Sequence, residues 1–412
     1  MNGDRDRRNA GFQALLGALE ARALVLLSAA GDDPERSFFV HPAKLGEALV
    51  VVPAGTGRSP RLGYLTPMER DEAAATGLEL LSPDDLDVAR WSRDSPQPGA
   101  FHANLLAQAL QRSGVAPGRI ALAGRLPFGL AHEVLERLGS EGWSFVSASA
   151  GLLAIRKRKT AGELAEIRRV AGVTCEAIRW VAGCLAGATV RDRELWREGE
   201  ALSVGRLKAG IAAVFAAAGL EQPRGNIVAP GGEGGVPHSS GSPERVLRDG
   251  ETLVVDLFPR GGLFADCTRT FCFGEPPPRV AAAFAAVHEA LQQAHAAARP
   301  GARGWDLQVA VCEAFTARGY ATPLSEPGTL QGYVHGLGHG VGFELHESPS
   351  FKRHAEEEGR LEIGDVLTLE PGLYDPDPAT GFGIRLEDLV HLDEAPENLT
   401  PLPYDLDPRA WV

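Results

Sequence analysis

The chain has 412 residues, enough for two or three domains, and its 44% hydrophobic and 23% charged residues are typical of a folded globular protein. Its 41 basic and 54 acidic residues give a net charge of −13, which argues against nucleic acid or anionic lipid as a partner. The five cysteines form no Cys-x-x-Cys pair, so we expect neither a disulfide framework nor a thiolate zinc site, and we expect a reducing compartment.

The amino-terminal residues are charged between Asp4 and Arg8 and lack the apolar core of a signal peptide. No later segment approaches the roughly 18 apolar residues of a membrane span. We therefore predict a cytoplasmic protein with no membrane partner.

Residues 1–155 predict an α/β domain, because helical and strand patterns alternate along them. The expected helices are 12–22, 100–112 and 130–138, and the expected strands are 23–28, 48–52 and 119–123. This region has no phosphate-binding loop and no dinucleotide fingerprint. A role in positioning or assembly is therefore favoured over cofactor binding.

A domain boundary is predicted at the basic run 156–159, which we expect to be a solvated linker. Thr160 follows, and Glu163 stands three residues later, which is the spacing of a capping box. We expect a long helix from there to Leu185, and a second domain that spans residues 156–412.

The second domain contains an internal repeat of a helix and a strand. Residues 250–256 and 364–370 each run from a glycine through an acid and an apolar strand to a carboxylate. Upstream, a Phe-x-Ala-x-Gly pattern ends a helical segment at 215–219 and again at 315–319. The simplest account is two similar αβ halves that face each other.

Two aspartates lie on neighbouring strands of a predicted hairpin. Alternation places Asp256 on one face with Val254 and Phe258, and Asp266 on one face of the next strand. If the chain turns about residues 260–262, the two aspartates stand directly opposite each other. Like charges opposed on a sheet are destabilising, so we expect a cation between them.

The second half repeats this arrangement with two glutamates. Glu370 ends the strand 366–369, and Glu387 lies on a strand predicted over 383–392, with Arg385 on the same face. Four carboxylates from two hairpins can neutralise two divalent cations that share a hydroxide. Oxygen-rich ligation suits manganese, cobalt or zinc, so we expect two divalent metal ions of this kind per subunit.

Histidines complete the predicted site. The run 335–342 carries His335, His339 and four glycines, so a helix is disfavoured and the backbone can bring both imidazoles to one point. His346 follows this run, and His238 stands in a separate segment. Imidazoles beside four carboxylates strengthen the prediction of a metal site.

Five short motifs occur in order in this half of the chain. They are Val254-Val255-Asp256, Ala265 to Thr270, the glycine-histidine run 335–342, Leu369 to Gly372 and Ile384 to Asp388. In this order, over about residues 160–405, they resemble the motifs of the pita-bread metallopeptidases, which include prolidase, aminopeptidase P and methionine aminopeptidase. The amino-terminal domain resembles the extra domain of the prolidase and aminopeptidase P branch.

This resemblance implies a fold and a set of residue roles. The fold is an α/β amino-terminal domain followed by an α+β pita-bread (creatinase/aminopeptidase-like) catalytic domain with pseudo-two-fold halves, and the assembly is a homodimer. The implied metal ligands are Asp256, Asp266, His339, Glu370 and Glu387, with Asp266 and Glu387 bridging two ions. The implied substrate and transition-state histidines are His238, His335 and His346.

Together these residues predict a two-metal hydrolase in which a metal-bridging hydroxide attacks a peptide carbonyl. Glu370 is placed to take and return the proton, and His238 or His346 could donate to the oxyanion or to the leaving nitrogen. Arg385 is expected to hold a metal ligand or a substrate carboxylate.

The family branch implies a short peptide substrate that is cut before a proline in second position, by an Xaa-Pro aminopeptidase or an Xaa-Pro dipeptidase. An Xaa-Pro bond has no N–H, so the enzyme must recognise the ring and protonate the nitrogen as it leaves. His335 and His346 around an apolar pocket with Tyr333 or Phe343 would suit this task. The alternatives are a metal-free pita-bread binding module and a creatinase-like amidinohydrolase, and both are disfavoured because all five ligands are present.

Overall fold

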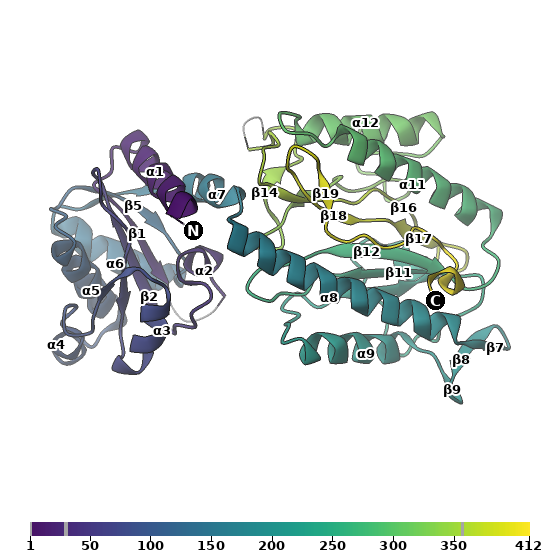
Figure 1. Cartoon of the computed structure of the whole chain (residues 1–412), viewed down its shortest axis with the longest axis horizontal. Helices are drawn as coiled ribbons and strands as arrows, with labels where there is room; N and C mark the ends of the chain where they lie inside the picture. Colours follow the sequence, from purple (N-terminus) through teal and green to yellow (C-terminus); the bar gives the residue numbers. More distant parts are fainter. Residues whose placement is uncertain (1, 29–31, 356–357) are drawn as a thin grey trace. The chain divides into compact units, whose positions relative to one another are not determined.

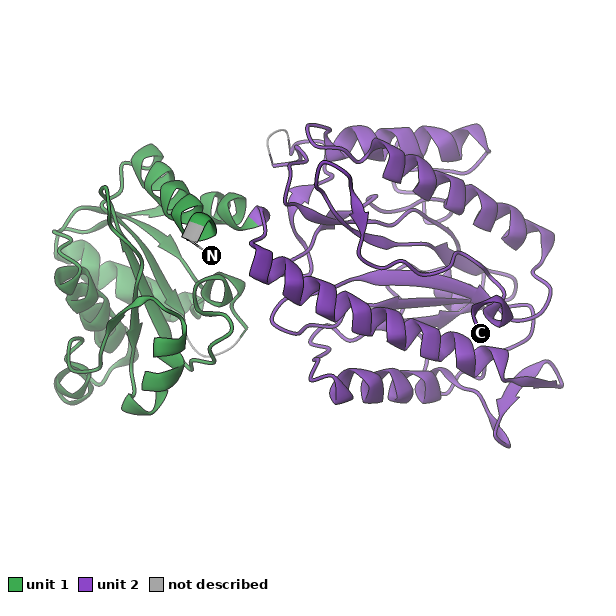
Figure 2. Ribbon diagram, in the orientation of Figure 1, with its two compact units in different colours: residues 1–156 green, residues 157–412 purple. Residues whose placement is uncertain are grey.

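The computed structural model describes residues 2–28, 32–355 and 358–412 and divides the chain into two compact units, Met1–Arg156 and Lys157–Val412 (Figure 2). Each unit has its own hydrophobic core. Among the helices described, none combines the length and the apolar character that a membrane crossing requires.

Unit 1 is an α/β domain built on a six-stranded sheet in the order β4-β3-β2-β1-β5-β6. Strand β2 runs antiparallel to both neighbours, whereas β1, β5 and β6 are parallel to one another. The strands are β1 (Ala23–Ser28), β2 (Ala48–Pro53), β3 (Arg61–Tyr64), β4 (Glu79–Leu81), β5 (Arg119–Ala123) and β6 (Ser144–Ser147). The helices are α1 (Asn2–Ala18), α2 (Pro34–Val40), α3 (Arg70–Ala75), α4 (Val88–Asp94), α5 (Pro98–Arg112), α6 (Phe128–Ser140) and α7 (Ser149–Lys157).

Most elements predicted for unit 1 are confirmed. The strands 23–28 and 119–123 have the predicted bounds, and β2 extends one residue further than expected. The predicted helix 12–22 is displaced, because α1 begins at Asn2 and ends at Ala18. Its first turns are polar and therefore carry no apolar period that could reveal them.

The basic run at the domain boundary is not a solvated linker, so this expectation was wrong. Three of its four residues are buried, including Lys157 and Lys159. The Lys159 ammonium lies 2.7 Å from Glu347 Oε1, and that of Lys157 lies 3.5 Å from Asp365 Oδ2. Carboxylates that are distant in sequence compensate these buried charges, which the local sequence does not reveal.

The long helix α8 (Ala161–Ala186) begins at the predicted capping box. The Thr160 hydroxyl accepts a hydrogen bond from the Glu163 N–H at 3.2 Å, and the Glu163 carboxylate accepts one from the Thr160 N–H at 2.9 Å. This reciprocal pair satisfies two donors that the first turn leaves open. The helix then packs against β11 and β12 and against α9.

Unit 2 combines two helix pairs with several small sheets. Figure 1 shows α8 and α9 on one side of β11 and β12, and α11 and α12 on the opposite side of the strands. The sheets have the orders β10-β11-β12, β14-β13-β15-β18-β19, β16-β17 and β7-β8-β9. The helices that follow α8 are α9 (Val204–Ala217), α10 (Gly231–Gly234), α11 (Pro278–Ala297) and α12 (Gly304–Ala317). The strands are β7 (Thr189–Arg191), β8 (Glu194–Arg197), β9 (Glu200–Ala201), β10 (Ile227–Pro230), β11 (Thr252–Leu257), β12 (Cys267–Cys272), β13 (His339–Gly340), β14 (Glu347–Ser350), β15 (Val366–Leu369), β16 (Gly372–Asp375), β17 (Phe382–Arg385), β18 (Asp388–His391) and β19 (Glu397–Asn398).

The internal repeat predicted from the sequence is present in the backbone. Helices α9 and α12 are followed by glycines with positive φ, 68° at Gly219 and 82° at Gly319. Gly250 and Gly364, which precede β11 and β15, also have positive φ, at 79° and 95°. These glycines allow the left-handed turns that end each helix and start each strand. The two halves therefore repeat the helix, both turns and the strand in one order.

The register of the first hairpin differs from the prediction. Asp256 lies opposite Thr268 rather than Asp266, because the turn is centred one residue later than expected, at Gly262. The Gly262 N–H donates to the Glu166 carboxylate of α8 at 2.8 Å, which fixes this turn. The shift moves the partner by two residues, so both aspartates keep the same face and lie diagonally across the strands.

The strand predicted over 383–392 is in fact two strands that belong to different sheets. β17 pairs with β16, and β18 pairs with β15. The chain crosses between the sheets at Glu387, whose N–H donates to the Thr268 carbonyl at 3.1 Å. Glu387 therefore lies at a change of sheet rather than within a strand.

The glycine-histidine run 335–342 is not helical, as predicted. A Cβ atom at Gly338 would lie 2.1 Å from the Thr368 carbonyl oxygen, and one at Gly340 would lie 2.0 Å from that of Ser348. These glycines are therefore required because the backbones of neighbouring segments approach closely.

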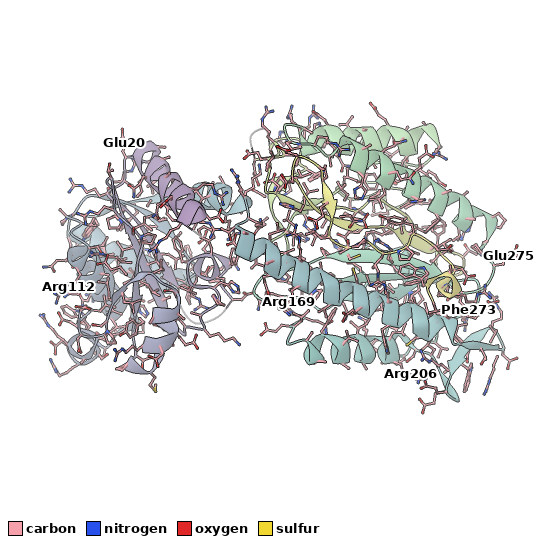
Figure 3. The ribbon with its side chains drawn as sticks, viewed as in Figure 1. Glu20, Arg112, Arg169, Arg206, Phe273 and Glu275 are labelled. Atoms are coloured by element: carbon pink, nitrogen blue, oxygen red, sulfur yellow. The ribbon has the colours of Figure 1, made fainter. Side chains whose placement is uncertain are left out.

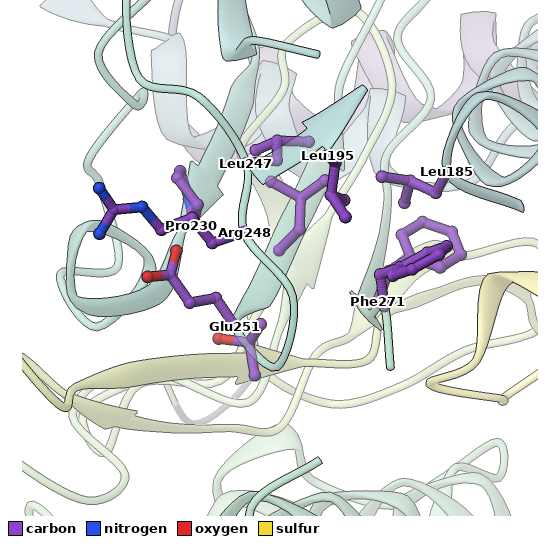
Figure 4. Close-up of a pocket in the computed structure, with 10 residues that line it drawn as sticks. Leu185, Leu195, Pro230, Leu247, Arg248, Glu251 and Phe271 are labelled. Atoms are coloured by element: carbon purple, nitrogen blue, oxygen red, sulfur yellow. The ribbon is translucent and has the colours of Figure 1, made fainter. Parts of the chain in front are cut away.

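Charged side chains such as Glu20, Arg112 and Glu275 lie at the periphery of their own units, as Figure 3 shows. A small cavity lies near the start of β11, bordered by Glu251 and Phe271 (Figure 4). None of the residues predicted for the metal site lines this cavity.

Candidate metal centre

Four predicted ligands from separate segments meet in unit 2. Asp266 directly precedes β12, His339 is on β13, Glu370 directly follows β15, and Glu387 lies between β17 and β18. The ligand atoms of Asp266, His339 and Glu387 all lie within 4.8 Å of one another, a spacing that could hold a metal ion. The Nε2 atom of His339 is 3.7 Å from Asp266 Oδ2 and 3.4 Å from Glu370 Oε1.

Asp256, on β11, is the fifth predicted ligand. Its Oδ2 atom accepts a hydrogen bond from Arg385 Nη2 at 2.5 Å. Its Oδ1 atom and the Oδ1 atom of Asp266 are buried and have no hydrogen-bond partner in the described part of the chain. A buried carboxylate oxygen without a partner is costly, and a bound cation would satisfy it.

The carboxylates repel one another in the metal-free chain. Burial, followed by the charges of Glu387 and Asp256, raises the pKa of Asp266 well above its usual value. Burial and the charge of Glu370 do the same to the pKa of Glu387. Burial raises the pKa of Glu370 itself to about 7, against the opposing effect of Arg385. Divalent cations would remove this repulsion, so the donor set fits metal ions that take oxygen and nitrogen ligands.

Arg385 and Thr268 connect two of the predicted ligands. The buried Arg385 donates from Nε to Thr268 Oγ1 at 3.1 Å, in addition to its contact with Asp256. The Thr268 hydroxyl in turn donates to Glu387 Oε2 at 2.7 Å. One guanidinium therefore orients Asp256 directly and Glu387 through a hydroxyl group.

His339 presents an unprotonated nitrogen to the carboxylates. Its Nδ1 atom lies 3.2 Å from the Gly340 carbonyl, which can only accept, so Nδ1 carries the hydrogen and Nε2 does not. Burial, followed by the charge of His346, lowers the pKa of His339 to about 3. The two rings meet edge to face with their centroids 4.2 Å apart. A neutral imidazole in this orientation can act as a metal ligand.

His335 and His339 have different immediate partners. His339 faces the carboxylates, whereas the Nε2 atom of His335 lies 2.8 Å from the Tyr374 hydroxyl. Burial and the charge of Arg385 lower the pKa of His335 to about 3. The glycines set the close approach of neighbouring strands, and the partners of each ring set its direction.

The other two histidines are exposed and come from different segments. His238 follows the short helix α10, and His346 directly precedes β14. Burial, followed by the charges of Arg224 and His238, lowers the pKa of His346. Both imidazoles are open to solvent, where a substrate could reach them.

Tyr333 and Phe343, expected beside an apolar pocket, are both buried. The Tyr333 hydroxyl donates to Gln308 Oε1 at 3.2 Å, and its ring meets the His335 ring edge to face at 5.3 Å between centroids. Tyr333 therefore supports the His335 ring from within the core.

Sequence reasoning did not single out Thr268 or Tyr374. Thr268 lies in the quoted motif around Asp266 and shares its strand face. Tyr374 is four residues past Glu370 and lies on β16, the strand that directly follows the glutamate. The signal was present, but tyrosine is also a common core residue.

Comparison with known proteins agrees with this fold. Residues 165–394 match the model of metallopeptidase family M24, and the chain belongs to this family. The chain shares its whole fold with the crystal structure of the prolidase from Pyrococcus horikoshii OT3, with a TM-score of 0.73 and 20% identity, covering 97% of this chain and 99% of the other. The fold is therefore that of the pita-bread peptidases with an amino-terminal domain, as the motifs imply.

Two curated relatives are similar in sequence over a shorter region. A probable dipeptidase PepE of Mycobacterium tuberculosis is 34% identical over 218 residues, which is 51% of this chain and 53% of the relative. An Xaa-Pro dipeptidase of Pyrococcus furiosus is 34% identical over 181 residues, which is 43% of this chain and 47% of the relative. The chain thus spans about half the length of the curated relatives it matches.

Proposed function

We propose that this chain is a dinuclear metallo-exopeptidase that hydrolyses the Xaa-Pro bond of dipeptides or short peptides. The observation that carries the proposal is the convergence of Asp266, His339 and Glu387, with Glu370 adjacent, in a member of metallopeptidase family M24. The proline preference is supported by the similarity to an Xaa-Pro dipeptidase of Pyrococcus furiosus.

The metal ligands proposed are the five residues named from the sequence. They are Asp256, Asp266, His339, Glu370 and Glu387, with Asp266 and Glu387 as the shared ligands of two ions. The Oδ1 atoms of both aspartates support this assignment, because each is a buried acceptor for which the described residues supply no hydrogen-bond donor. Bound divalent ions would make water acidic enough to serve as the nucleophile at neutral pH. Manganese, cobalt and zinc all suit this donor set.

Glu370 is proposed to take a proton from the nucleophilic water and to return it to the products. Its Oε1 atom lies at the edge of the cluster, 3.4 Å from His339 Nε2 and 3.4 Å from the Thr368 hydroxyl. In the metal-free chain burial raises its pKa to about 7 against the charge of Arg385, and bound cations would favour the ionised form that accepts a proton.

The exposed histidines are proposed as proton donors. His346 stacks edge-on against His339 and thus lies next to the cluster, whereas His238 comes from another segment. Desolvation that lowers the pKa of His346 makes its protonated form a stronger acid toward the leaving nitrogen. His335 and Arg385 are proposed to orient groups at the site.

The substrate assay follows from the chemistry of the bond. Xaa-Pro dipeptides, Xaa-Pro-Yaa tripeptides and matched alanine peptides are incubated with chelator-treated protein to which manganese, cobalt or zinc is restored. We expect turnover of the proline peptides only, and about two ions per subunit by elemental analysis. Turnover of the alanine peptides alone would contradict the proline preference.

Variants separate the proposed roles. His346→Ala should lose most of the rate yet keep its metal, because the residue is proposed to donate a proton and not to ligate. Asp266→Asn should lose metal and activity together, because it is a proposed bridging ligand. Active protein with no more than trace metal would favour the metal-free alternatives instead.

The compartment is proposed from the state of the cysteines, and the oligomeric state is proposed from the family. All five cysteines are free and buried, which supports a reducing compartment such as the cytoplasm. A homodimer is proposed from the family, and light scattering of the purified chain tests it.

A further inference from the structure

Tyr374 lies between two of the proposed site residues. It is on β16, and only 1% of its surface is exposed. Its hydroxyl oxygen is 2.8 Å from Arg385 Nη1 and 2.8 Å from His335 Nε2. These two contacts decide where the hydroxyl proton points.

The direction of each hydrogen bond follows from which groups can donate and which can only accept. A guanidinium has donors only, so the Tyr374 oxygen accepts from Arg385. The tyrosine proton then points to its other partner, His335 Nε2. Burial raises the pKa of Tyr374 well above its ordinary value, which keeps that proton on the oxygen.

The second ring nitrogen of His335 is also engaged. Its Nδ1 atom lies 2.7 Å from the Gly336 carbonyl oxygen, which can only accept. Nδ1 therefore carries the hydrogen, and Nε2 is the unprotonated nitrogen that accepts from Tyr374. With both nitrogens occupied, the ring has no hydrogen left to donate to a substrate.

We propose that Tyr374 is a positioning residue that donates to the unprotonated Nε2 of His335, the nitrogen left without a hydrogen by the Nδ1 contact with Gly336, and so excludes this ring from proton transfer. The hydrogen-bond assignment is independent of the proposed function. Its consequence for catalysis rests on that function: the proton donor is then one of the exposed histidines, and His335 offers only its ring surface to a substrate. The contacts of Tyr374 also complete a continuous chain of hydrogen bonds from Asp256 through Arg385, Tyr374 and His335 to Gly336. This chain joins a proposed metal ligand on β11 to the segment that carries His339.

The tautomer can be read directly from the metal-free full-length chain by NMR of protein labelled with 15N-histidine. His335→Gln assigns the resonances of His335 by their loss. We expect a hydrogen on Nδ1 and an unprotonated Nε2 in the unmodified chain. In Tyr374→Phe we expect the same tautomer, with the Nε2 resonance displaced downfield because its hydrogen bond is gone.

A matched variant separates the hydroxyl contact from general packing. Tyr333→Phe removes a hydroxyl from the other tyrosine whose ring contacts His335, but that hydroxyl donates to Gln308. It should leave the Nε2 resonance of His335 in place. A hydrogen on Nε2 in the unmodified chain, or an Nε2 resonance that does not move in Tyr374→Phe, would overturn the proposal. Since neither metal nor peptide is present, a chain without peptidase activity would count against the proposed function alone.

Discussion

Glu370 makes the metal-free protein sensitive to pH in a direction that can be calculated. Folding raises the pKa of its carboxyl group from 4.5 to about 7. The folded state therefore binds a proton that the unfolded state has released over this range, so stability is lost as the pH rises. The shift corresponds to about 3 kcal/mol, fully present below pH 4.5 and absent above pH 7.

The perturbation that isolates this effect is Glu370→Gln, which cannot titrate. Other groups change stability with pH as well, and the lowered pKa values of His335 and His339 act in the opposite direction, because the unfolded state binds their protons more readily. The difference between the unmodified chain and the variant cancels the terms of groups that Glu370 does not affect. The charge of Glu370 also helps to raise the pKa values of Asp266 and Glu387, so losing it in the variant adds to the difference in the same direction. We expect the unmodified chain to lose about 3 kcal/mol relative to the variant between pH 4.5 and 7.5.

The assay is urea denaturation of both chelator-treated proteins at half-unit steps of pH. Glu313→Gln, which removes an exposed carboxylate on α12, is the matched control and should follow the unmodified chain. Added manganese should then stabilise the unmodified chain more than Glu370→Gln, because the variant has lost a proposed ligand. A stability difference that is independent of pH, or that grows in favour of the unmodified chain as the pH rises, would refute the reasoning.

Two further substitutions test the buried charges around the site. Arg385→Lys keeps the charge but cannot reach Asp256, Thr268 and Tyr374 together, so we expect turnover or metal affinity to fall by roughly 10-fold to 100-fold, measured by peptide assay and by metal retention on dialysis. A fully active variant would remove its proposed role. Lys159→Met leaves the Glu347 carboxylate buried without its ammonium partner, and we expect a loss of about 3–5 kcal/mol in urea denaturation, partly recovered by adding Glu347→Gln. A loss below about 1 kcal/mol would show that solvent or another group compensates the glutamate.

The sequence was sufficient to indicate the types of donor and the strands next to which the carboxylates lie. The four carboxylates follow from local patterns, such as an acid at the end of an apolar strand, whereas the choice of His339 among the histidines comes from the family resemblance. The repeat of helix, glycine and strand predicted two similar halves, and positive φ angles at Gly219 and Gly319 confirm that the equivalent turns are alike. These features depend on a few neighbouring residues, which is why they can be read along the chain.

The features that could not be predicted depend on contacts between distant segments. The hairpin turn is centred at Gly262 because its N–H bonds to Glu166, 96 residues away. Lys159 is buried because Glu347, 188 residues away, supplies its counter-charge. Neither partner has a local signature, so the local pattern gave the wrong register for the hairpin and the wrong environment for the lysine.

The proposed ligands share a structural setting that explains why folding tolerates their repulsion. Asp266, Glu370 and Glu387 all lie where a strand begins, ends or changes sheet, and none lies within a regular strand. A side chain at such a position can turn toward the cluster without disturbing a ladder of backbone hydrogen bonds. The regular strands and the helices on either side supply the burial that holds the two halves together. Because that same burial raises the pKa values of these carboxyl groups, the fold itself creates the demand for positive charge that a divalent ion would meet.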